Sequence, residues 1–289
     1  MARLRIVTLL RAVALMIVVT AIALVAREQW RAASSLRTRR TEASRTVEVR
    51  KALFAEIQPV RLTNCELRRF GEPNDGGYPL CVNLLGGVKA AYSYGIAGYD
   101  GWGCEVSRRL QVPVHEYDCF DLRPPSCPDG RAVFHGECIG TARETQDGRP
   151  FDTLSNQFAR NGDASTPIVM KIDVEGAEWD AFLLAPDSTL SQIDQIDVEF
   201  HQVGDAKYVE AIRRLKQFFY IAHVHYNNFS CDPLLEPFPS WAFEVLLVNK
   251  RLAQTDGSPA SIAKEIDAPN NPTLPDCQPA PRTSAMNRE

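Results

Sequence analysis

Four carboxylates follow an apolar run in the stretch MKIDVEGAEWD. Asp173 and Glu175 come shortly after PIVM, and Glu178 and Asp180 follow them, with Gly176 between the two pairs. An apolar run of this length indicates a buried strand, and glycine allows the backbone to turn sharply into a helix. Glu178 and Asp180 then fall in the first turn of that helix, where carboxylates oppose the helix dipole favourably. Asp173 and Glu175 end the strand and are candidate catalytic residues.

Strand and helix patterns alternate through the middle of the chain. The expected strands are 89–96, 112–118, 131–139, 167–173, 192–200, 219–226 and 241–249. The expected helices are 99–110, 151–160, 177–185 and 206–218. Such alternation predicts an α/β fold built from βαβ units, with a mostly parallel sheet and helices on both faces. Sheets of this kind bind ligands at the carboxyl ends of their strands.

The ends of the expected strands carry residues suited to binding a nucleoside. The first strand leads into a turn that contains Gly95 and Gly98, where a ligand could approach the backbone closely. Asp118 ends the second strand, at the position where a carboxylate binds the ribose in nucleoside-binding sheets. Glu199 and His201 end the strand QIDVEFH and complete the candidate catalytic set.

Two nucleoside chemistries suit this edge: hydride transfer with a dinucleotide, and methyl transfer from S-adenosylmethionine. A dinucleotide requires a G-x-G-x-x-G turn for its pyrophosphate, and the spacing of Gly95 and Gly98 does not fit that turn. The last strand, WAFEVLLVN, brings the number of expected strands to seven, which suits a methyltransferase sheet. The sequence therefore predicts S-adenosyl-L-methionine as the cofactor.

Several motifs resemble those of the FkbM-type and related methyltransferase-like families. VMKIDVEGAEW is similar to their signature, an apolar strand followed by K-x-D-x-E-G-x-E. RRFGEPNDGGYPLC, YSYGI and HEYD are similar to the branch in which a D-G-G-Y segment precedes the core, so the resemblance covers roughly residues 65–249. It implies a class I S-adenosylmethionine-dependent methyltransferase with a Rossmann-like sheet of seven strands, which O-methylates a hydroxyl of a saccharide or similar small acceptor.

The resemblance also implies donor-binding roles for Gly95 and Asp118. Most enzymes of this class carry an acid two residues before the first glycine, where this chain has Ser93. That departure makes Asp75 and Asp173 the candidates for the missing polar contact with the donor. Asp75 belongs to the D-G-G-Y segment, which is alternatively only a tight turn.

Methyl transfer to a hydroxyl requires alignment of the reactants and removal of the hydroxyl proton. A carboxylate or histidine base, or a metal ion that acidifies the hydroxyl, would meet the second requirement. His223 and His225 are weak candidates for metal ligands, because a lone histidine is more often a hydrogen-bonded structural residue. A divalent metal is therefore not the favoured cofactor. The alternative function is a membrane-tethered nucleoside-binding domain without activity, since a fold does not entail an activity.

The N-terminus combines an apolar run with a cluster of arginines. The run AVALMIVVTAIALVA, extended by IVTLL before Arg11, is about long enough to cross a bilayer. The arginines that follow outnumber those before it, which favours an uncleaved single-pass anchor with the main domain in the cytoplasm. A cleaved signal peptide and a secreted domain are the alternative. The formal net charge of -4 gives no reason to expect a nucleic-acid partner.

The expected organisation is a membrane anchor over residues 1–26, a basic juxtamembrane linker over 27–59, a methyltransferase domain over 60–250 and a disordered tail over 251–289. The tail is rich in proline and poor in apolar residues, so it cannot bury enough surface to order itself. The eight cysteines match no zinc-binding spacing. For a cytoplasmic domain we expect them to be reduced thiols, including Cys65 and Cys81; disulfides are the alternative for an exported one.

Overall fold

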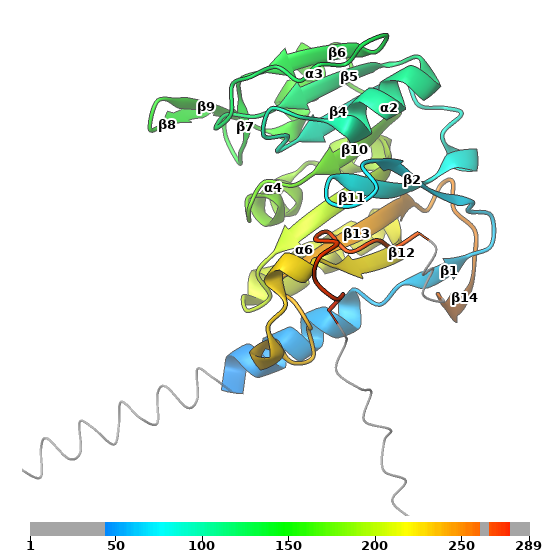
Figure 1. Cartoon of the computed structure of the whole chain (residues 1–289), viewed down its shortest axis with the longest axis vertical. Helices are drawn as coiled ribbons and strands as arrows, with labels where there is room; N and C mark the ends of the chain where they lie inside the picture. The colour runs from blue at the N-terminus through cyan, green and yellow to red at the C-terminus, as the bar shows by residue number, and fades with distance from the viewer. Residues whose placement is uncertain (1–43, 261–265, 278–289) are drawn as a thin grey trace, which may run out of the picture. The chain divides into compact units, whose positions relative to one another are not determined.

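The computed structural model describes residues 44–260 and 266–277 (Figure 1). The chain divides into two compact units, Met1–Glu48 and Val49–Glu289, and the elements below belong to the second. The predicted membrane anchor lies outside the described residues. Within the two described ranges, no helix is both long enough and apolar enough to span a bilayer.

A sheet of seven strands forms the centre of the second unit. In chain order its strands are β4 (Ala90–Tyr94), β5 (Pro113–Tyr117), β6 (Arg131–His135), β10 (Ile168–Ile172), β11 (Ile193–His201), β12 (Phe219–Tyr226) and β13 (Ala242–Asn249). Their order across the sheet is β12-β13-β11-β10-β4-β5-β6, and β13 runs in the direction opposite to the other six strands. The predicted α/β fold with a mostly parallel seven-stranded sheet is therefore confirmed.

The strand order places a topological switch point between β4 and β10. From β4 the chain proceeds through β5 and β6 to one edge of the sheet, then returns to β10 and continues outward through β11 on the other side. Ligands of open α/β sheets bind at the carboxyl ends of the strands at such a point. Gly95 and Asp173, which follow β4 and β10, are therefore placed where a ligand is expected.

The two faces of the sheet are covered differently. One face packs against the helical residues 49–56 and against α3 (Leu154–Arg160), α4 (Glu178–Leu184), α5 (Asp187–Gln192) and α6 (Ala206–Phe218). The other face packs against α2 (Gly101–Leu110) and the hairpin of β2 (Leu67–Gly71) and β3 (Gly77–Cys81), which lie side by side (Figure 1). Alternation along β4 serves both layers, because Tyr92 and Tyr94 belong to the first core and Ala91 to the second.

Smaller elements surround this core. They are β1 (Val60–Leu62) paired with β14 (Thr255–Pro259), the sheet of β7 (Cys138–Ile139), β8 (Glu144–Gln146) and β9 (Arg149–Asp152), and the 3-10 turns Val82–Leu84, Asn228–Ser230 and Pro233–Leu235. The single strand predicted over 131–139 is divided, because β6 joins the main sheet whereas β7 pairs with β9. The helix predicted from residue 151 begins at Leu154, after Thr153 caps it by accepting the Asn156 N–H.

The eight cysteines form four disulfides, so the expectation of reduced thiols is wrong. The pairs are Cys65–Cys81, Cys104–Cys127, Cys119–Cys138 and Cys231–Cys277. They close loops of 16 to 46 residues, and in the chain-entropy account such loops contribute about 3 to 4 kcal/mol each. Two of them flank the glycine turn after β4: Cys104 lies on α2 and Cys119 directly follows Asp118.

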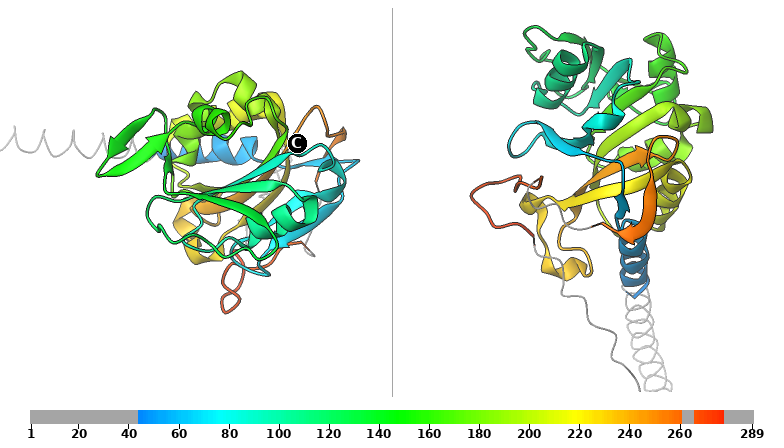
Figure 2. Two further views of the ribbon diagram at one scale, coloured as in Figure 1. Left: turned by 90° about the horizontal axis from the view of Figure 1, so that it is seen from above. Right: turned by 90° about the vertical axis from the view of Figure 1, so that its right-hand side faces the viewer.

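The prediction of a disordered tail is wrong for residues 251–260 and 266–277. β14 pairs with β1, and the segment 266–277 lies beside the chain that follows β12 (Figure 2). Asn270 and Cys277 are buried within this segment. We call residues 266–277 the C-terminal strap, because its disulfide to Cys231 and its polar side chains fasten it beside the sheet.

We expect a thiol reagent to label no cysteine of the denatured chain before reduction and all eight after it. The structural reason is that every cysteine has its partner sulfur in place. Intact-mass measurement counts the labels, and non-reducing peptide mapping identifies the pairs. Labelling of Cys65 or Cys81 without reduction would contradict the structure.

Candidate functional site

The ends of β10 and β11 bring four predicted residues together. His201 ends β11, and its Nε2 lies 3.7 Å from Asp173 Oδ1, 3.5 Å from Glu175 Oε2 and 3.8 Å from Glu199 Oε1. We call Asp173, Glu175, Glu199 and His201 the carboxylate–histidine cluster. The structure thus gathers all four candidate catalytic residues at the carboxyl edge of the sheet, beside the switch point.

Glu178 positions the histidine of this cluster. Its side chain is fully buried, and its Oε1 accepts the backbone N–H of His201 at 2.8 Å and lies 3.2 Å from the His201 Nδ1. Its Oε2 accepts the Gly176 N–H at 2.8 Å, while the neighbouring Trp179 donates its indole N–H to the His201 carbonyl at 2.6 Å. Two consecutive residues of α4 therefore fix both the backbone and the ring of His201.

The sequence predicts for Glu178 only a role in opposing the helix dipole, and the structure adds a second role. Glu178 does stand in the first turn of α4, but it faces inward. The sequence does contain a signal for this inward orientation, because Glu178 and Phe182 are four residues apart and so share one face of the helix. A phenylalanine on that face indicates that the face is buried. Asp180 instead pairs with Lys207, and its side chain is half-exposed.

Burial and the neighbouring charges shift the pKa values of residues in the cluster. Burial, with Asp173 and Glu244 adding to it, raises the pKa of Glu199 well above its usual value. Burial also raises the pKa of Asp173, against the opposing charges of Lys171 and His201. Burial alone would lower the pKa of His201, but the carboxylates around the ring outweigh it and raise the pKa to about 9. A positive charge at this point therefore stabilises the cluster.

Tyr78 and Asn227 hold the carboxylates from the side of the hairpin and of β12. The Tyr78 hydroxyl is 3.4 Å from Asp173 Oδ2 and 3.5 Å from Glu199 Oε2. Asn227 donates its side-chain amide to Glu199 Oε1 at 2.7 Å. Tyr78 is the residue of the D-G-G-Y segment that reaches the cluster, whereas Asp75 accepts a hydrogen bond from Asn270 of the C-terminal strap at 3.0 Å.

The turn after β4 is locked against β10. Gly95 has φ +71°, and a Cβ there would overlap the carbonyl oxygen of Asp173, so this position requires glycine. Lys171 donates its ammonium to the Gly95 carbonyl at 2.9 Å, and the Asp173 N–H bonds to the Tyr94 carbonyl at 3.1 Å. The turn and the first cluster carboxylate are therefore in direct backbone contact.

Asp118 holds the same turn through its carboxylate. Oδ2 accepts the N–H groups of Ile96 and Ala97 at 3.1 and 2.8 Å, and Oδ1 accepts those of Phe120 and Asp121 at 2.8 and 3.0 Å. These four donors occupy the acceptor positions that a carboxylate has. Asp118 therefore braces the turn in this structure, and its predicted contact with a ribose stays a prediction. Gly98, at φ +77°, completes the turn.

Ser93, which stands where the sequence resemblance would lead one to expect an acid, is buried in β4 and in register with Glu116 of β5. Glu116 is itself fully enclosed, and burial together with the charge of Asp100 raises its pKa to about 8. The Glu116 carboxyl group is thus present next to position 93, but it belongs to the neighbouring strand and is buried from solvent.

His223 and His225 each pair with a carboxylate that is not a member of the cluster. His223 Nε2 is 2.6 Å from Asp267 of the C-terminal strap, and His225 Nδ1 is 3.3 Å from Glu244. Among residues 44–260 and 266–277, the side chains placed closely enough to share a metal ion are those of Asp173, Glu175 and His201. The weak prediction of metal ligation by His223 and His225 therefore has no geometric support.

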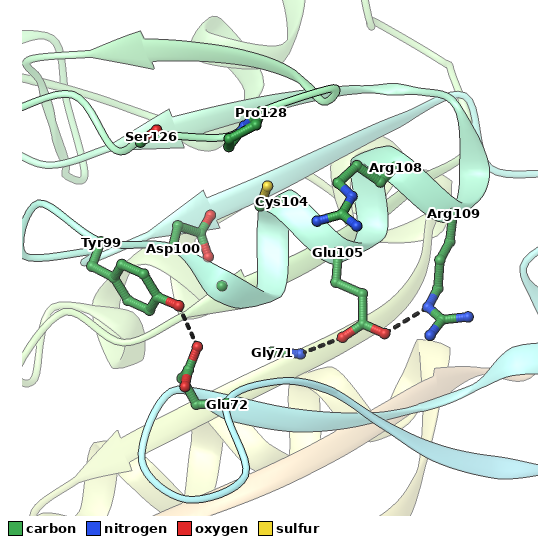
Figure 3. Close-up of a pocket in the computed structure, with 11 residues that line it drawn as sticks. Gly71, Glu72, Tyr99, Asp100, Cys104, Glu105, Arg108, Arg109, Ser126 and Pro128 are labelled. Atoms are coloured by element: carbon green, nitrogen blue, oxygen red, sulfur yellow. Dashed lines mark hydrogen bonds and ion pairs between the residues drawn. The ribbon is translucent and has the colours of Figure 1, made fainter.

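A pocket of about 630 Å³ lies on the flank of α2 (Figure 3). It borders the turn after β4 through Tyr99 and Asp100 but is lined by no residue of the carboxylate–histidine cluster. Two of its acids are paired with neighbours: Glu105 accepts the Gly71 N–H at 2.9 Å and bonds to Arg109 at 2.6 Å, and Glu72 accepts the Tyr99 hydroxyl. This pocket is consequently separate from the candidate site.

The sequence matches no protein-family model, and no curated protein shows significant similarity to it.

Proposed function

We propose that the second unit is an S-adenosylmethionine-dependent methyltransferase that O-methylates a hydroxyl of a saccharide or similar small acceptor. The observation that carries the proposal is the acidic cluster at the switch point, in backbone contact with a glycine turn. The insertion of antiparallel β13 between β11 and β12 gives the seven-stranded arrangement that the motif resemblance implies.

The residues at this edge fit the donor by charge. Three carboxylates of the cluster lie around His201 at this edge, and such a set favours a ligand that carries positive charge. S-adenosylmethionine supplies a methyl group on a positively charged sulfur. The turn of Gly95 and Gly98, with Asp173 beside it, would hold the donor, while Asp118 would act indirectly by keeping the turn in place.

The remaining chemistry belongs to the side chains of the cluster. An acceptor hydroxyl must lose its proton as its oxygen gains the methyl group, and a carboxylate within hydrogen-bond distance would accept that proton. The raised pKa of Glu199 suits this role, because it brings the carboxylate closer to the basicity that proton transfer requires. Tyr78 and Asn227 would keep Glu199 oriented.

Calorimetry of the purified chain with S-adenosylmethionine and S-adenosylhomocysteine tests the proposal. We expect saturable binding of both nucleosides and formation of S-adenosylhomocysteine when a panel of saccharides is added. Binding without turnover would favour a nucleoside-binding domain that lacks activity, an alternative compatible with the full engagement of Asp118 by backbone groups. Absence of binding would exclude both functions.

We infer that the domain works in an oxidising compartment. Four disulfides are typical of exported or lumenal proteins and rare in the cytoplasm. This favours the exported arrangement over the cytoplasmic one that the arginine cluster predicts. Methyl transfer there would require a supply of S-adenosylmethionine on the same side of the membrane.

A further inference from the structure

We propose that Asp173, Glu175 and His201 bind a divalent transition-metal ion through two carboxylates and one imidazole nitrogen. The proposal concerns the same edge of the sheet as the proposed methyl transfer, but it depends only on the geometry of these side chains.

The separations of the three side chains suit a shared ion better than direct hydrogen bonds. Their ligand atoms all lie within 4.8 Å of one another. The His201 Nε2 is 3.5 Å from Glu175 and 3.7 Å from Asp173, beyond the roughly 2.9 Å of an ordinary N–H···O bond. Ligands about 2.0 to 2.2 Å from one ion stand roughly 3 to 4 Å apart, and both separations from the His201 Nε2 fall within this range.

The His201 ring provides an independent observation. Its side chain is only 6% exposed, and its Nε2 points into the carboxylates without a hydrogen bond to any described residue. The other ring nitrogen faces the buried Oε1 of Glu178 at 3.2 Å. A metal-ligating histidine almost always has its second nitrogen bonded to a carboxylate or carbonyl, which fixes the ring and directs the free nitrogen toward the ion.

The site is open on one side. The Glu175 side chain is 82% exposed and that of Asp173 is 26% exposed, so an ion from solvent can reach both. Three protein ligands leave coordination positions for water or for a substrate oxygen, as in catalytic metal sites. Glu199, the fourth member of the cluster, is already bonded to Asn227 and can remain outside the coordination sphere as a base.

The donor set indicates the class of ion. Mg²⁺ and Ca²⁺ favour oxygen ligands alone, and an imidazole favours zinc, iron and similar ions. One nitrogen with two carboxylates therefore suits Mn²⁺ or Zn²⁺. Such an ion lowers the pKa of a bound hydroxyl or water, which would ease deprotonation of an acceptor at this edge.

Mn²⁺ binding to the purified full chain, freed of metal with a chelator, tests the proposal. Electron paramagnetic resonance distinguishes free from bound Mn²⁺, and no nucleoside is added. We expect one saturable site per chain and displacement of Mn²⁺ by Zn²⁺ more readily than by Mg²⁺. Asp173→Asn and Glu175→Gln should each weaken binding by at least tenfold. Glu178→Gln, which removes no proposed ligand but alters the support of the His201 ring and backbone, should weaken it by about 10- to 100-fold.

Asp180→Asn is the matched control, because its carboxylate lies on the same helix as Glu178 but pairs with Lys207 at the surface. Circular dichroism checks that each variant is folded. Absence of Mn²⁺ and Zn²⁺ binding at millimolar metal, or equal affinity in the Asp173, Glu175 and Asp180 variants, would overturn the proposal. Either result would leave nucleoside binding to be judged by calorimetry, so the two proposals fail separately.

Discussion

Replacement of Asp118 with alanine is expected to lower the free energy of unfolding by about 4 kcal/mol. The carboxylate accepts four backbone N–H groups, two from the turn after β4 and two from its own loop. Hydrogen bonds to a charged group contribute about 1.5 to 3 kcal/mol each, and bonds to one group are less than additive. Urea unfolding under non-reducing conditions, which keeps the disulfides intact, measures the change.

Asp118→Asn sharpens this prediction. Asparagine has the same shape, but its amide nitrogen would face two N–H donors and could accept neither of them. We therefore expect the asparagine variant to be destabilised nearly as much as the alanine variant. The control is Asp121→Ala: Asp121 pairs with Arg123 at the surface, and its own backbone N–H, which Asp118 accepts, is kept. An equal loss of stability in the Asp121 variant would contradict the bracing role of Asp118.

The layout of the sheet was predictable because its strands are apolar and its connections are helical. Segments such as KAAYSYGI and FYIAHVHY have strand-like composition whatever their neighbours, and the α/β alternation limits how they can be arranged. The meeting of Asp173 and His201 followed from the same rule, since the carboxyl ends of neighbouring parallel strands share one edge.

The features that the sequence did not reveal depend on contacts between distant segments. The C-terminal strap is held by hydrogen bonds, such as that of Asn270 to Glu244, and by the disulfide of Cys277. Neither kind of contact produces a periodic pattern of apolar residues in the sequence. Cysteine pairing depends on which loops the fold brings together. The hydrogen bonds from backbone groups to Asp118 also leave no pattern in the sequence, because N–H donors are present at every residue except proline.

Asp173→Asn is expected to reduce methyl transfer by about 10²- to 10⁴-fold, the range associated with losing a positioned acid or base. The asparagine retains the size of the side chain and can still accept the Tyr78 hydroxyl. It removes the negative charge that faces both His201 and Lys171. The measurement is S-adenosylhomocysteine formation with whichever saccharide of the panel gives the unaltered chain its highest rate.

We expect replacement of a more deeply buried carboxylate of the cluster to lower the methyl-transfer rate more. Asp173 is held between Tyr78 and Lys171, whereas the Glu175 side chain is largely exposed. Water can therefore replace more of the polar interactions of the Glu175 carboxylate than of the Asp173 carboxylate. Glu175→Gln should therefore lower the rate by less than Asp173→Asn, and Asp180→Asn should leave it unchanged. If the Asp173 and Asp180 variants turned over at equal rates while remaining folded, the carboxylate after β10 would be a structural residue of the helix turn. The chemistry would then have to be sought elsewhere along the sheet edge.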